Sequence, residues 1–393
     1  MTDTNPDILR EYASTHPWLT FKVDLAKASP RLWMLLGEAA SKCEHIAGVP
    51  LDQATAQALH QMYLAKGVHA TTAIEGNTLS EEQVLDRVEG RLHLPDSQQY
   101  LEREVDNILA ACNKVCDDIR AGRRTWELTV ETFCDFNAQV LDGLEEEGVV
   151  PGRVRRHSVG VGRYVGAPWQ DCELLLGLLC EWLNGPAFRP PPGQQIHFAI
   201  IKAALAHVYL AWIHAFGNGN GRTARLVEFQ VLVGAGVPTP AAHLLSNHYN
   251  ETRSEYYRQL DRTSRGGDLL GFLEYALGGF IDGLRSQLRL IRGYQWDLAW
   301  RNFVEQAFRG QSSPSDLRRK QLVLDLSGRD RPVARADLRM LTPALAAAYA
   351  GKTDKTLTRD LNSLPVANLI ERKPEGYRAR MEIILAFLPL RAE

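Results

Sequence analysis

The chain has 393 residues, and its 45 Lys and Arg nearly balance its 47 Asp and Glu, so the formal net charge is −2. A hydrophobic content of 45% and a charged content of 23% are typical of a globular protein and exclude disordered, collagen-like and disulfide-framework chains. The length predicts two or three domains. The charge is unevenly spread, because residues 311–393 hold 15 Lys and Arg against 10 Asp and Glu.

Cysteine usage and hydropathy favour a cytoplasmic chain. The six Cys residues form no CxxC pair, so we expect free thiols in a reducing compartment. The N-terminus is polar and acidic, unlike a signal peptide. Lys202 and three His residues interrupt the longest apolar stretch, so no membrane partner is expected.

Helical periodicity dominates roughly the first 300 residues. The apolar spacing predicts helices at 101–119, 126–144 and 194–214, and a Gly-rich segment between the last two predicts a β-hairpin at 158–166. A short linker at 311–314 precedes further helices and two short strands. We therefore expect three regions: an N-terminal helical region at 1–110, a core at 111–310 and a C-terminal domain at 311–393.

A glycine-rich loop joins two predicted helices at residues 214–225. Its glycines allow positive φ and let backbone N–H groups converge on an anion, and the following helix contributes its positive N-terminal end. Arg222 and Arg225 add two guanidinium groups three positions apart. His214, at the rim, is suited to take a proton from a hydroxyl. The segment therefore predicts a phosphate cradle with a base beside it.

The same segment resembles the Fic family motif, HxFx(D/E)GNGRxxR. Seven fixed positions match it: His214, Phe216, Gly219, Asn220, Gly221, Arg222 and Arg225. The hairpin at 158–166 is similar to the family's flap, and the resemblance extends over residues 15–290. It implies a mainly α fold in which a Fic-type helical core carries a β-hairpin flap.

The resemblance also implies a protein adenylyltransferase, which moves AMP from ATP to a Ser, Thr or Tyr hydroxyl of a target protein with Mg²⁺. His214 would deprotonate the hydroxyl of a target docked as an added strand on the flap at 158–166. Arg222 would neutralise charge on the leaving side. The nucleotide phosphates would meet Gly219, Asn220, Gly221, Arg222 and Arg225, and the base would meet Tyr256 and Tyr257.

One departure from the family pattern concerns the metal. The family's acidic metal ligand is replaced by Asn218, whose amide oxygen ligates Mg²⁺ without a charge. We expect weak or altered metal dependence. Asn218 also leaves open a different chemistry on the same cradle, such as reversal of the modification. Ala215 stands where Pro is usual.

A second motif, at Thr71 to Gly76, matches the family's inhibitory pattern (S/T)xxxE(G/N). Thr71 and Glu75 are four apart and share a helix face. By resemblance, Glu75 would pair with Arg225 and keep this arginine from the γ-phosphate. The alternative is a plain helix end with a solvated carboxylate.

The C-terminal domain is similar to a winged helix-turn-helix, with a recognition helix at 355–364 and a wing at 369–380. Leu357, Leu361 and Leu364 would face its core. Its basic side chains would reach DNA phosphates from 352–380: Lys355, Arg359, Arg372, Lys373, Arg378 and Arg380. Protein contact, either target docking or a homodimer, is the other interpretation.

Two functions therefore compete. The leading one is a protein adenylyltransferase that is autoinhibited by Glu75. The alternative is a winged-helix DNA-binding regulator whose Fic core senses nucleotide, removes the modification or is weakly active. His207, one heptad before His214, is interpreted as a packing residue.

Overall fold

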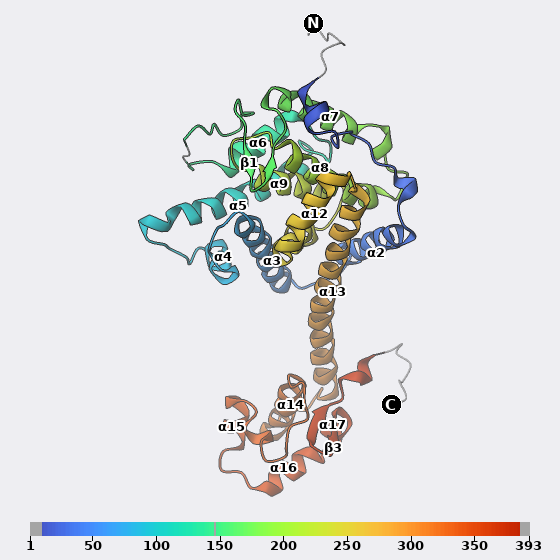
Figure 1. The fold of residues 1–393 in the computed structure, drawn as a ribbon. Coiled ribbons are helices and arrows are strands. Elements are labelled where there is room, and N and C mark those ends of the chain that lie inside the picture. The colour runs from blue at the N-terminus through green and yellow to red at the C-terminus, as the bar shows by residue number, and fades with distance from the viewer. Residues whose placement is uncertain (1–9, 145–146, 386–393) are drawn as a thin grey trace. The chain divides into compact units, whose positions relative to one another are not determined.

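The structure, a computed structural model, describes residues 10–144 and 147–385, without the side chains of residues 364 and 365. It is mainly helical with two small hairpins, which confirms the predicted fold class (Figure 1). The chain divides into two compact units, Met1–Leu288 and Arg289–Glu393. The second unit therefore begins earlier than the predicted boundary after residue 310. The reason is that Trp300, Val304 and Phe308 are buried in the second hydrophobic core.

The first unit contains most of the helices and one hairpin. In chain order its elements are α1 (Glu11–Thr15), α2 (Pro30–Ala47), α3 (Gln53–Ile74), α4 (Glu81–Val88), α5 (Gln99–Arg120), α6 (Val130–Val140), β1 (Gly160–Val161), β2 (Tyr164–Val165), α7 (Cys172–Asn184), α8 (Gln195–Ile213), α9 (Asn220–Gly234), α10 (Thr239–Ala242), α11 (Leu244–Glu251) and α12 (Arg253–Gly266). Helix α13 (Leu269–Ala307) begins in this unit and ends in the second.

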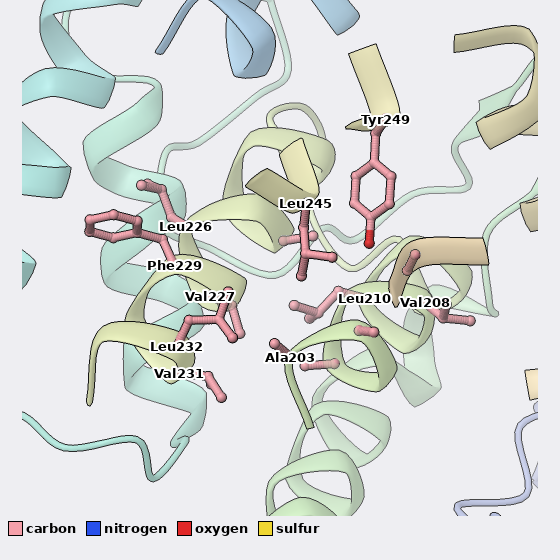
Figure 2. Packing of buried hydrophobic residues seen from close by; sticks show 14 of the residues in the cluster. Ala203, Val208, Leu210, Leu226, Val227, Phe229, Val231, Leu232, Leu245 and Tyr249 are labelled. Carbon is pink, nitrogen blue, oxygen red and sulfur yellow. The ribbon is translucent and has the colours of Figure 1, made fainter. Parts of the chain in front are cut away.

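Helices α8 and α9 form the centre of the first unit. The longest apolar stretch of the sequence becomes α8, whose length and hydropathy would suffice to cross a membrane. However, 78% of its apolar window is buried inside the protein, as expected for a helix that is hydrophobic on all sides. Figure 2 shows labelled side chains of α8, α9 and α11 meeting in this core.

Local capping explains where several helices begin. The side chain of Asp52 accepts a hydrogen bond from the Thr55 amide and starts α3. Thr129 caps α6 in the same way, so this helix is shorter than the predicted 126–144. Helix α3 packs against α4, α5, α9 and α11, which brings its C-terminal end beside the start of α9.

The second unit continues with helices and ends in a hairpin. Its elements are α14 (Pro314–Ser327), α15 (Pro343–Tyr349), α16 (Asp354–Leu361), α17 (Leu364–Leu369), β3 (Ile370–Lys373) and β4 (Gly376–Ala379). Strands β3 and β4 pair antiparallel, and Val333 adds a bridge to Tyr377. The predicted recognition helix corresponds to α16, where Leu357 and Leu361 are buried. The side chain of Leu364 lies outside the described part.

A buried carboxylate organises this second core. Asp360, 1% exposed, accepts hydrogen bonds from Arg318 Nε at 2.8 Å, Arg319 Nε at 2.9 Å and the Tyr349 hydroxyl at 2.9 Å. Burial alone would raise the pKa of Asp360, but these donors outweigh burial and hold the pKa below its ordinary value.

Candidate functional site

The catalytic candidate His214 stands at a left-handed turn. Helix α8 ends at Ile213, and His214 adopts φ 51° and ψ 53°, a conformation uncommon outside glycine. Arg155 holds this turn, since its Nε donates to the His214 carbonyl at 2.7 Å. Other nitrogens of the same guanidinium donate to the carbonyls of His157 and Ala167. Sequence reasoning missed Arg155, because nothing in its spacing distinguishes it from its exposed neighbours.

The His214 imidazole is arranged as a neutral base. Its Nδ1 lies 3.3 Å from the Ala211 carbonyl, which only accepts, so Nδ1 carries the proton and Nε2 keeps its lone pair. Burial lowers the pKa of His214, and the positive charge of Arg155 lowers it further. The ring is therefore unprotonated at neutral pH.

The loop after His214 is shaped by two asparagine side chains. Asn220 accepts from the Phe216 amide at 2.9 Å and donates to the Phe216 carbonyl at 2.8 Å. Asn137, fully buried on α6, donates to the Asn218 carbonyl at 2.8 Å. The side-chain amide of Asn220 closes the loop, so the predicted phosphate contact of Asn220 would come from its backbone N–H. Gly219, at φ 75°, turns the chain into α9.

Asn218 does not form a ready metal site. Its Oδ1 accepts a hydrogen bond from the Gly219 amide, so this oxygen is already engaged by the loop. Among the described residues, no group of three or more His, Cys, Asp or Glu side chains could hold a metal ion. The residues present therefore do not fit a protein-held Mg²⁺, which prefers carboxylates together with substrate phosphates.

Arg225 is held by the predicted inhibitory segment. Its Nη2 lies 2.6 Å from Glu75 Oε1 and 3.0 Å from the Thr71 carbonyl oxygen. The Arg225 side chain is 1% exposed and that of Glu75 is 30% exposed toward the pocket. Burial alone would raise the pKa of Glu75, but Arg225 and Arg222 outweigh it and hold the pKa below its ordinary value.

The Glu75 carboxylate lies directly against the loop backbone. A Cβ atom added to Gly221 would come within 2.2 Å of Glu75 Oε1, so only glycine fits this position while Glu75 is in place. The carboxylate thus sits at the N-terminal end of α9, where backbone N–H groups and the helix dipole attract an anion. Thr71 contributes its carbonyl rather than its hydroxyl to the contact with Arg225.

The second motif arginine has its own carboxylate. Arg222 Nη1 lies 2.8 Å from Glu104 Oε1, and the side chain of Arg222 is 4% exposed. The other oxygen of Glu104 accepts from Asn77 Nδ2 at 2.8 Å. Glu104, on α5, therefore links the loop to the chain just after Glu75. Sequence reasoning did not single out Glu104, which lies 118 positions before its partner.

A cavity of about 440 Å³ opens beside His214. Glu75, His214 and Gly221 line one side, and Tyr256 and Tyr257 of α12 line another. The Tyr256 side chain is 3% exposed, and its hydroxyl lies 2.8 Å from His207 Nε2. Tyr257 is 44% exposed. The structure thus places both tyrosines at the cavity, and His207, which is buried, lines it as well.

The hairpin β1–β2 borders the same cavity. Val161 pairs with Tyr164, whose hydroxyl donates to the Trp212 carbonyl at 2.7 Å and ties the hairpin to α8. Val161 and Val165 are 51% and 60% exposed. The predicted flap is therefore present next to His214, with apolar side chains directed to solvent.

Fold and site together define a class of helical proteins in which a histidine and a glycine-rich anion loop join two central helices. The sequence model of the Fic/DOC family matches residues 127–232, so the chain carries a Fic/DOC family domain. Protein adenylyltransferase fic-1 from Caenorhabditis briggsae is 30% identical over 209 residues, which are 53% of this chain and 38% of that protein. Protein adenylyltransferase Fic from Nematostella vectensis is 26% identical over 227 residues, or 58% and 48%. The chain thus spans less than half the length of these relatives.

Solved structures share the fold. A Fic family protein from Desulfovibrio desulfuricans has a TM-score of 0.56 at 21% identity, covering 89% of this chain and 96% of that one. Fic-1 from Caenorhabditis elegans has a TM-score of 0.53 at 23% identity, covering 67% and 73%. At these identities the likeness supports the fold.

Proposed function

We propose that the protein is an adenylyltransferase that moves AMP from ATP to a Ser, Thr or Tyr hydroxyl of a target protein. The observation that carries this proposal is the neutral His214, with Nε2 free to accept a proton, beside an anion loop and two arginines. The adenylyltransferase relatives supply the donor, ATP, and the kind of acceptor, a protein.

The transfer step follows from these positions. The target hydroxyl oxygen forms a bond to the α-phosphorus of ATP, and its proton passes to His214 Nε2. The bond between the α-phosphorus and the bridging oxygen breaks, and pyrophosphate leaves. Backbone N–H groups at the start of α9 and Arg222 stabilise the negative charge that gathers on the phosphates.

Glu75 restrains this reaction. Its carboxylate lies against Gly221 and pairs with Arg225, so it takes the place of an anion at the loop. While it does so, Arg225 Nη2 is engaged by Glu75 and the Thr71 carbonyl and is not available to the γ-phosphate, and ATP is held unproductively. Release of Glu75 therefore activates the enzyme.

One experiment tests the function. The Glu75→Gly protein is incubated with ATP, and mass spectrometry measures the mass added to the chain itself. We expect an added AMP on the Glu75→Gly protein and none on the doubly substituted Glu75→Gly, His214→Ala protein. An unmodified Glu75→Gly chain, or equal modification of both variants, would contradict the proposal.

We further infer that transfer depends only weakly on Mg²⁺, because Asn218 offers an engaged amide oxygen in place of a carboxylate. Asn218→Asp, in the Glu75→Gly background, should raise transfer in Mg²⁺ roughly three- to tenfold, as one added carboxylate ligand strengthens metal binding. Transfer without divalent ion serves as the control. No gain in Mg²⁺ would refute the metal argument.

A second candidate function, DNA binding, belongs to the second unit. Lys355, Arg359 and Arg372 are exposed and have no carboxylate partner within the described residues, which favours phosphate contact. Lys373 and Arg378, by contrast, pair with Glu371. A gel shift at rising salt tests DNA binding, and binding that does not weaken with salt would exclude phosphate contacts. His214→Ala should leave any such binding unchanged.

A further inference from the structure

A second hollow also borders the glycine-rich loop. It has a volume of about 610 Å³, and Gly217 of the glycine-rich loop forms part of its wall. Most of the remaining wall comes from the segment that leads into β1, including Arg153, Arg156 and His157. The hollow therefore adjoins the loop that follows His214, and its wall reaches His157, just before the hairpin at 158–166 that is predicted to dock the target.

The charge of this hollow is positive and unbalanced. Arg153 and Arg156 are exposed, and neither forms an ion pair with a carboxylate in the described part of the chain. Arg155 adds a third positive charge, because its donors go to backbone carbonyls that do not neutralise it. Glu173 lines the hollow too, but no ion pair joins it to these arginines. Among the described residues that line the hollow, one carboxylate thus stands against three guanidinium groups.

The hairpin adds another positive charge close to the hollow in sequence. Arg163, at the turn between β1 and β2, lines the nucleotide cavity and is also without a carboxylate partner among the described residues. From Arg153 to Val165 the sequence holds no Asp or Glu. A chain with a formal charge of −2 therefore presents its docking hairpin within a local basic surface.

We propose that this basic hollow selects target proteins whose modified hydroxyl lies in an acidic segment. The proposal rests on the adenylyltransferase function and names its substrate class. Side chains of Asp and Glu flanking the hydroxyl enter the hollow and pair with Arg153 and Arg156 while the segment lies along the flap. Arginine suits this task because its planar fork pairs with a carboxylate through two hydrogen bonds.

A randomised peptide pool tests the proposal. Decapeptides with a central Ser, Thr or Tyr and random flanks are incubated with the full-length Glu75→Gly protein and ATP, and mass spectrometry sequences the AMP-bearing fraction. We expect Asp and Glu to be enriched in the flanks roughly three- to tenfold over the input, the range expected from a few exposed ion pairs. The enrichment should shrink at high salt, which screens exposed charges.

Charge reversal at the hollow gives the decisive comparison. Arg153→Glu with Arg156→Glu should turn the preference toward Lys and Arg, whereas Arg189→Glu, an exposed and unpaired control outside the hollow, should keep the acidic preference. A preference that survives the double reversal, or a pool modified without regard to charge, overturns the proposal. The proposal is also contradicted if the Glu75→Gly protein adds AMP to itself but to no peptide of the pool.

Two further outcomes separate this proposal from its alternatives. If the Glu75→Gly chain gains no AMP on itself, the proposed function fails, and the failure is distinct from a lost charge preference. If the double reversal raises the KM for ATP or abolishes binding of a single-stranded oligonucleotide, the hollow serves nucleotide or nucleic acid, and the acidic-target proposal is wrong. Thermal melting confirms that each variant is folded.

Discussion

Two sets of arginines lie within one site, and their surroundings are opposite. Arg222 and Arg225 are buried, and each is paired with a carboxylate from another helix or helix end. Arg153, Arg156 and Arg163 surround the flap without a carboxylate partner in the described residues. The first set is neutralised within the chain itself, and the second is left to be neutralised from outside.

The difference shows how one residue type serves two tasks. A buried guanidinium needs a partner, because an unpaired buried charge costs several kcal/mol. The loop arginines therefore pair with Glu104 and Glu75. An exposed guanidinium stays solvated at little cost, so the flap arginines can wait for a partner. In the two proposals above, restraint lies in the loop and recognition lies at the flap.

The largest effect should come from removing the base His214, which belongs to neither set of arginines. His214→Ala, in the Glu75→Gly background, should reduce transfer about 10²- to 10⁴-fold, the usual contribution of a general base. Binding of an acidic peptide, followed by fluorescence anisotropy, should not change, because no flap arginine is touched. A parallel loss of peptide binding would show that the loop and the flap are not separate.

The next effect concerns the cost of burial. Glu104→Ala leaves Arg222 without its carboxylate and removes one of the two acceptors of Asn77 Nδ2, so the free energy of unfolding should fall by about 2–4 kcal/mol. Arg156→Ala removes an exposed and unpaired charge and should stay within about 0.5 kcal/mol. Urea unfolding of both variants measures the contrast. Equal losses would mean that the two sets do not differ in burial cost.

Sequence patterns predicted both loop arginines and Glu75, but not the partner of Arg222. The motif spacing pointed to His214, Arg222 and Arg225, because a loop between two helices places neighbours in sequence beside each other. Glu104 and Arg155 could not be predicted, since a side chain that meets a distant segment or a backbone carbonyl leaves no periodic signal. The loop-closing role of the Asn220 side chain could not be predicted for the same reason: its two hydrogen bonds to Phe216 depend on the folded turn.

The limits of domains and helices likewise divide into those that local sequence patterns predict and those that only tertiary packing reveals. Helical periodicity predicted the mainly α fold and the hairpin, because both depend on local pattern. The second unit begins at Arg289, inside a single continuous helix, where neither glycine nor proline marks a change. Only the burial of Trp300 and Val304 in a separate core reveals it.

Release of Arg225 from Glu75 should raise activity, and this effect should be smaller than the loss caused by His214→Ala. Glu75→Gly should raise self-modification roughly ten- to hundredfold, since a 1.4–2.8 kcal/mol contact at Arg225 would be removed, within the range for hydrogen bonds to charged groups. The same contact stabilises the fold, so the melting temperature should fall as activity rises. Labelled ATP and a thermal melt measure the two changes. A more active variant of unchanged stability would show that Glu75 restrains without stabilising.

The smallest effect should be that of pH above neutrality. Because burial lowers the pKa of His214 below its ordinary value near 6.5, the base is already unprotonated at pH 7. Transfer by the Glu75→Gly protein should therefore change less than about twofold between pH 7 and 8.5, as expected of a base titrating below that range. It should fall only as the pH drops through the lowered pKa and the imidazole takes up a proton.

Low pH should affect transfer at the loop and peptide binding at the flap differently. The flap arginines stay protonated throughout, and peptide carboxylates keep their charge down to about pH 4–5. Peptide binding should consequently persist at pH values where transfer has already declined. If both decline together, or if transfer rises steeply above pH 7, His214 is not the neutral base and the contrast between loop and flap needs another explanation.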